Sequence, residues 1–210
     1  MSGPGDSSVR QRLEGTGRLE AFSDGVMAII LTLLVLELRL PEVEGHDTGA
    51  FIAAFLQVAP KFLSFTLSFA LVAIYWVNHH HFMSRVTHTD WKLLWANNTF
   101  LFFLAVVPFS TAVLGDHPLD AVPIAFYGLD VAFAALAFSV MARYVYFGGN
   151  LVSPAVPMAE RAAEARRGFI SSLVFVAAAA SGFVFPPVAL AIFVLVPITY
   201  VVPTVLGGDG

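Results

Sequence analysis

Six long apolar runs dominate this chain of 210 residues. A helix of about 20 apolar residues crosses the roughly 30 Å hydrocarbon core of a bilayer, whereas a membrane-spanning strand needs only about ten. The runs therefore predict an all-α integral membrane protein with six transmembrane helices. We expect these helices at Arg18–Leu40, Phe51–Phe82, Lys92–Leu114, Ala121–Phe147, Gly168–Phe185 and Pro187–Val205.

Two segments beside these spans leave their exact limits open. The second run is longer than one crossing requires, so Phe51–Pro60 is either part of the span or an interfacial or peripheral stretch before a span that starts near Lys61. The charged segment Met158–Arg167 is expected to form a short amphipathic helix that leads into the fifth span.

Composition excludes several classes of protein. The chain is 58% hydrophobic and only 12% charged, with a mean hydropathy of +0.78, which is unlike a soluble domain. It has no cysteine, so disulfides and thiolate metal sites are excluded, and its net charge of -4 provides no basic surface for nucleic acid. Neither a phosphate-binding loop nor a hydrolase triad or zinc motif occurs. We therefore expect neither an enzyme nor a bound cofactor or metal.

The basic residues are distributed asymmetrically between the two sides of the predicted membrane protein. Nine of the eleven lie on one side if the N-terminus is cytoplasmic, and only Arg39 and Lys61 lie on the other. This bias predicts that both termini are cytoplasmic. It also divides the chain into an N-terminal cytoplasmic segment (residues 1–17), a membrane domain (residues 18–205) and a C-terminal tail (residues 206–210).

The first span carries a distinctive stripe. At about 100° per residue, one face of this helix presents an aromatic ring, a glycine, several aliphatic side chains and one hydroxyl group. These residues are Phe22, Gly25, Ile29, Thr32, Leu33 and Leu36. Such a face either lines a narrow conduit or packs against lipid and neighbouring helices, and periodicity alone does not distinguish the two.

Residue identities in the first three spans carry a family resemblance. Arg18 is followed at a fixed spacing by Phe22-Ser23-Asp24, and then by Thr32–Glu37 and Pro41. Later segments extend the pattern, at Tyr75–Phe82 and at Leu93–Phe100 with Val107-Pro108-Phe109-Ser110. Together they resemble the prokaryotic transmembrane protein 175 potassium-channel family.

This resemblance implies a homotetramer in the bacterial inner (plasma) membrane, in which the first helix of each subunit lines a central pore. Potassium would be the permeant ion and not a bound cofactor. Ile29, Leu33 and Leu36 would form aliphatic rings, with Ile29 the tightest constriction and gate. Thr32 would provide a ring of hydroxyl groups that gives modest selectivity for potassium over sodium.

The resemblance also implies a structural network behind the pore. Ser23 and Asp24 would tie the first helix to polar groups on neighbouring helices, with Arg18 as a charge partner of Asp24. The expected members of this network are Arg18, Phe22, Ser23, Asp24, Trp76, His80, His81 and Asn97, with Asn98 as the alternative to Asn97. An Asp24 that simply faces water among the lipid headgroups is the other interpretation.

Two features support different functions. Asp130 lies deep in the fourth run, and an acidic residue inside a membrane is a functional candidate. With the histidine cluster, Asp130 would suit a secondary or proton-coupled transporter, although a structural bond to Tyr127 or to another helix explains it as well.

The adjacent residues His79, His80 and His81 point about 100° apart on a helix, so they cannot jointly bind one metal ion. A non-conducting scaffold is the third possibility.

Overall fold

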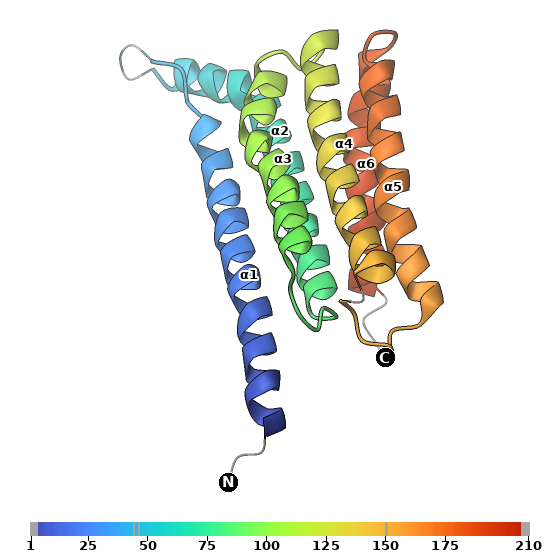
Figure 1. The fold of residues 1–210 in the computed structure, drawn as a ribbon. Helices are drawn as coiled ribbons and strands as arrows, with labels where there is room; N and C mark the ends of the chain where they lie inside the picture. The colour runs from blue at the N-terminus through green and yellow to red at the C-terminus, as the bar shows by residue number, and fades with distance from the viewer. Residues whose placement is uncertain (1–3, 44, 46, 150, 207–210) are drawn as a thin grey trace.

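The computed structural model describes residues 4–43, 45, 47–149 and 151–206, and this part of the chain folds into a bundle of α-helices. Figure 1 shows α1 at one edge of the bundle, α2 and α3 beside it, and α4, α5 and α6 at the other edge. The α-helices are α1 (Pro4–Leu34), α2 (Thr48–Met83), α3 (Trp91–Asp116), α4 (Ala121–Arg143), α5 (Met158–Ser181) and α6 (Pro186–Leu206). A 3-10 turn, η1 (Val35–Glu37), follows α1, and a π-helical turn, η2 (Tyr144–Gly148), follows α4.

Four helical segments within the described residues are long and apolar enough to cross a membrane. They are Thr16–Glu37, Thr48–Met83, Trp91–Asp116 and Ala121–Gly148. The apolar part of α6, Pro186–Thr199, is shorter, and the first ten residues of α5 are charged and alanine-rich. The all-α membrane architecture is therefore confirmed.

The first and last helices differ in their ends from the predicted spans. Helix α1 begins at Pro4, so the helix that we expected to begin at Arg18 starts fourteen residues earlier. Helix α6 ends at Leu206. The rest of the predicted tail, residues 207–210, and the first three residues of the chain lie outside the described residues.

Helix α2 changes direction near its middle. Its first part runs across the end of the bundle, and its second part runs along the other helices (Figure 1). Pro60 lies inside this helix, where proline removes a backbone hydrogen bond and bends the chain. The segment before Pro60 is therefore peripheral to the bundle, as one of the two interpretations of the second run required.

The segment Met158–Arg167 is not a separate helix. It is the beginning of α5, which continues without a break through Gly168 to Ser181. Small residues allow α5 to pack closely against α4, because a Cβ atom added at Gly128 would lie 2.8 Å from Ala179, and one added at Gly168 would lie 3.0 Å from Ser139.

Candidate functional site

Helix α1 has two opposite faces. One face is buried against α2 and α3 and repeats every three or four residues: Leu19, Ser23, Met27, Ile30 and Leu34. The other face is open on the single chain, with Phe22 54% exposed, Ile29 59%, Leu33 43% and Leu36 59%. The predicted stripe is therefore a real, unpartnered surface of an apolar helix.

Thr32 provides the hydroxyl group on this open face. Its Oγ1 donates a hydrogen bond to the carbonyl of Ile29 at 2.8 Å. A hydroxyl has one hydrogen and two lone pairs, so this bond leaves its oxygen free to accept. Gly25 lies on the same face, and a Cβ atom there would meet nothing within 4 Å. The face thus offers an acceptor oxygen one turn from the aliphatic side chain of Ile29.

A buried chain of hydrogen bonds holds the opposite face of α1. Asn97 of α3 donates from Nδ2 to Ser23 Oγ at 2.9 Å, and His79 Nε2 donates to Asn97 Oδ1 at 2.8 Å. Ser23 Oγ donates in turn to the carbonyl of Leu19 at 2.9 Å. Because the three side chains are buried and mutually bonded, they fix α1 against α2 and α3.

Asp24 makes a second, more exposed link to α2. Trp76 Nε1 donates to Asp24 Oδ1 at 3.0 Å, and the Trp76 ring stacks on His80 with centroids 6.1 Å apart. No ion pair joins Arg18 to Asp24 among the side chains that the structure describes. The two residues are six positions apart on one helix and so do not face each other.

Within one chain, His79, which was not among the expected members, joins the buried network, while His80 stacks on Trp76 and His81 belongs to neither link. His79 is the buried member of the network, whereas His80 and His81 are exposed. His79 shares one buried face of α2 with Val72, Phe82 and Met83. Most residues of α2 before the histidines are apolar, so the sequence spacing does not single out this face. The alternative between Asn97 and Asn98 is resolved as well, since Asn98 is exposed.

Asp130 belongs to a separate buried polar contact between α3 and α4. Ser110 Oγ donates to Asp130 Oδ2 at 2.6 Å. Tyr127 instead lies 3.1 Å from Ser68 Oγ, which accepts from Thr111 at 2.7 Å. Asp130 is thus bonded to another helix and not to Tyr127. No group of three or more potential metal ligands occurs within the described residues.

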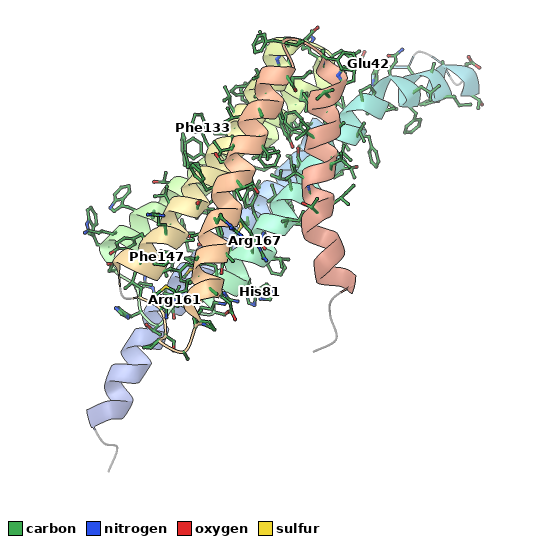
Figure 2. All side chains as sticks on the ribbon, turned by 90° about the vertical axis from the view of Figure 1, so that its right-hand side faces the viewer. Glu42, His81, Phe133, Phe147, Arg161 and Arg167 are labelled. Carbon is green, nitrogen blue, oxygen red and sulfur yellow. The ribbon has the colours of Figure 1, made fainter. Side chains whose placement is uncertain are left out.

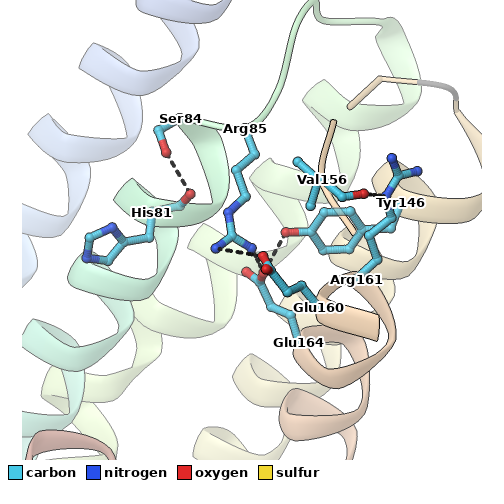
Figure 3. A network of polar contacts seen from close by, with 8 residues as sticks. All are labelled: His81, Ser84, Arg85, Tyr146, Val156, Glu160, Arg161 and Glu164. Carbon is cyan, nitrogen blue, oxygen red and sulfur yellow. Dashed lines mark hydrogen bonds and ion pairs between the residues drawn. The ribbon is translucent and has the colours of Figure 1, made fainter. Parts of the chain in front are cut away.

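Polar contacts at one end of the bundle join two loops that are distant in sequence (Figure 3). Arg85, after α2, pairs with Glu164 of α5 at 2.8 Å and with Glu160 at 3.8 Å. Tyr146 of η2 donates to the same Glu164 at 2.6 Å. An isolated antiparallel bridge pairs Val86 with Val152. The connection between α2 and α3 is therefore held against η2, the loop that follows it and the first part of α5.

Comparison with known proteins identifies related channels. The family described as "Endosomal/lysosomal potassium channel TMEM175" matches residues 18–108, which include the open face of α1 and its network. A potassium channel of Chryseobacterium sp. (strain P1-3) is 34% identical over 187 residues, covering 89% of this chain and 93% of the relative. A potassium channel of Chamaesiphon minutus is 36% identical over 141 residues, covering 66% and 70%.

A solved structure has the same fold. The crystal structure of a lysosomal potassium-selective channel TMEM175 homolog from Chamaesiphon minutus superposes with a TM-score of 0.78 at 29% identity, covering 90% of this chain and 97% of that one. These relatives are named as channels and not as enzymes, in agreement with the expectation from the sequence.

Proposed function

Since this chain belongs to the TMEM175 family, we propose that it forms a homotetrameric, potassium-permeable channel whose conduit is lined by the open face of α1. The open face itself is the observation that carries the proposal. An apolar helix buried on one side and bare on the other needs further partners, and one copy of α1 cannot enclose a conduit. Four copies arranged around an axis turn each exposed side chain into a ring.

The rings at Ile29, Leu33 and Leu36 form the gate in this proposal. A narrow aliphatic ring excludes water and therefore stops ions unless it widens. Ile29, which is 59% exposed on the single chain against 43% for Leu33, is assigned the tightest constriction.

The ring at Thr32 gives modest selectivity. Its acceptor oxygen replaces part of the hydration shell of a cation, and potassium loses water more easily than sodium. The back-bond to Ile29 orients that oxygen, so the filter and the gate are adjacent on the helix.

The network residues have a positioning role. Ser23, Asn97 and His79 hold the buried face of α1, while Asp24 and Trp76 hold its flank. Arg18 and Phe22, both exposed on the single chain, lie at the start of the span and face neighbouring copies or the conduit entrance.

The proposed topology places six spans in the bacterial inner membrane, with both termini cytoplasmic. The charge asymmetry supports this orientation, because Arg85, Arg143 and the Arg166-Arg167 pair lie at the end of the bundle opposite Lys61. Helices α5 and α6 complete the six spans, with Arg166 and Arg167 at the membrane surface.

A planar bilayer with potassium on one side and sodium on the other tests the function. We expect a current that reverses toward the potassium potential. Thr32→Ala should lower the permeability ratio of potassium to sodium roughly 2- to 10-fold, since one hydrogen-bond-like contact is worth about 0.5–1.5 kcal/mol. Thr99→Ala is the matched control, because Thr99 is also exposed and bonded back to its own helix, at 2.9 Å to Trp95.

A second variant separates a channel from a carrier. Asp130→Asn retains an acceptor for Ser110, and Asp130 lies outside the matched range 18–108. The channel proposal therefore expects unchanged reversal potential and conductance. Loss of transport in this variant, or the absence of any current from well-incorporated protein, would contradict the proposal in favour of an Asp130-based carrier.

A further inference from the structure

Two neighbouring arginines on α5, Arg166 and Arg167, form an exposed pair without a partner in the described part of the chain. No ion pair or side-chain hydrogen bond joins either guanidinium group to a residue that the structure describes. Figure 2 shows Arg167 further along α5 than Arg161, towards the end of the bundle opposite to Glu42. The two charges of this arginine pair are therefore open to a partner outside the chain.

The other charged residues at the start of α5 are already engaged. Glu164 pairs with Arg85 at 2.8 Å, and Glu160 lies 3.8 Å from the same arginine (Figure 3). Arg161 donates to two backbone carbonyls of the preceding loop, both at 2.9 Å. These contacts use every charge of the segment Met158–Arg167 except the arginine pair. The nearby carboxylates are thus bound to Arg85 and do not neutralise it.

Contacts between α4 and α5 place the arginine pair at the edge of the membrane-spanning part of the bundle. Ser139 Oγ of α4 donates to the carbonyl of Ala165 at 2.8 Å, and a Cβ atom added to Gly168 would lie 3.0 Å from the same serine. The arginine pair lies between these two residues and so at the level of Ser139. Residues 121–138 of α4, which precede Ser139, extend about 27 Å, close to the roughly 30 Å of a hydrocarbon core. The guanidinium groups therefore lie where the lipid headgroups begin.

An apolar stripe continues along α5 from the arginine pair into the membrane. Phe169, Ile170 and Leu173 are three, four and seven positions after Arg166, so they share one face of the helix with it. Their side chains are 50%, 49% and 55% exposed. Helix α5 also lies at the edge of the bundle opposite α1 (Figure 1), away from the proposed conduit. This face therefore combines cations at the membrane surface with an apolar surface beneath them.

A phospholipid has the matching order of groups, with a phosphate above its acyl chains. We propose that the arginine pair binds the phosphate group of an anionic phospholipid, with an acyl chain along Phe169, Ile170 and Leu173. A guanidinium group donates two parallel hydrogen bonds to phosphate oxygens. Anionic lipid also attracts each arginine near the surface by about 5-fold in affinity, whereas the choline of phosphatidylcholine offsets its phosphate. Phosphatidylglycerol should therefore bind in preference to phosphatidylcholine.

Quenching by brominated lipids tests this site. The chain has no cysteine, so Leu173→Cys provides a single position for a bimane label beside the proposed acyl chain. In vesicles of phosphatidylcholine, brominated phosphatidylglycerol should quench the label half-maximally at a mole fraction at least about 5-fold lower than brominated phosphatidylcholine does. The double variant Arg166→Gln with Arg167→Gln should remove this preference. Equal quenching by the two lipids in the parent would overturn the proposal.

Arg143→Gln is the matched control, because Arg143 is an exposed arginine in the last turn of α4, at the same end of the bundle. This variant should keep the preference for phosphatidylglycerol. An equal loss in both variants would mean a general attraction of positive charge to the bilayer, and would overturn the site. Potassium flux in the same vesicles separates the two proposals: flux without lipid preference contradicts the lipid site alone, and lipid preference without flux contradicts the channel alone.

Discussion

At the scale of single residues, the side-chain amide of Asn97 holds α1 against α2 and α3. Asn97 uses its donor for Ser23 and its acceptor for His79, and all three side chains are buried. Asn97→Ala leaves the buried His79 donor without its partner and removes the bond that Ser23 accepts, while Ser23 still donates to Leu19. An unsatisfied buried polar group costs about 1–3 kcal/mol of stability. We expect a lower thermal unfolding temperature in detergent. Asn98→Ala, on the exposed side of the same helix turn, should change it little, and equal shifts would contradict this role.

The limits of sequence reasoning are also clearest among these residues. Apolar runs predicted where helices lie, and the stripe from Phe22 to Leu36 is open as its periodicity allowed. Which of the three histidines is buried depends on how α2 is rotated about its axis against α3. Three consecutive histidines in the sequence do not reveal this rotation. Helix α5 was predicted to start too late, because charged Arg166 and Arg167 interrupt the apolar pattern without interrupting the helix.

At the scale of elements, Asp90 joins the start of α3 to η2. Its carboxylate accepts from Leu93 N at 2.8 Å and from the Tyr144 hydroxyl. Burial would raise the pKa of Asp90, but the Tyr144 and Leu93 hydrogen bonds, with the charge of Lys92, outweigh it and lower the pKa below its usual value. The ionised carboxylate is thus favoured in the folded protein. Its stabilisation is present above the unfolded pKa of about 3.9 and is lost as the pH falls through the lower folded value.

Asp90→Ala should therefore lower the free energy of unfolding by about 1 kcal/mol at neutral pH, as expected for a lost helix N-cap. The difference from the parent should shrink below about pH 4, where the parent carboxylate becomes protonated. Denaturation in detergent at a series of pH values measures both effects. Asp120→Ala is the control, because Asp120 occupies the N-cap of α4 without a capping side-chain hydrogen bond. A pH-independent difference would contradict the assignment.

At the scale of the whole molecule, two neighbouring isoleucines on α1 have different roles, one on the open face and one in the core. Ile29 is 59% exposed on the single chain and Ile30 is 2% exposed. In the proposed tetramer, Ile29→Ala widens the constriction and should raise single-channel conductance with little effect on the stability of the subunit. Ile30→Ala leaves a cavity in the core and should cost about 2–5 kcal/mol of stability at unchanged conductance. Single-channel recording with thermal unfolding separates these outcomes, and reversed effects would exclude Ile29 as the constriction.

The division of α1 into a buried and an open face has a consequence for how such proteins diversify. Substitutions on the open face, at positions such as 29, 32 and 33, leave the packing against α2 and α3 untouched. Surface changes away from core packing usually alter stability by less than about 0.5 kcal/mol. In the proposed tetramer, natural selection or a protein engineer can therefore change the pore lining one position at a time without changing the residues that fold each subunit.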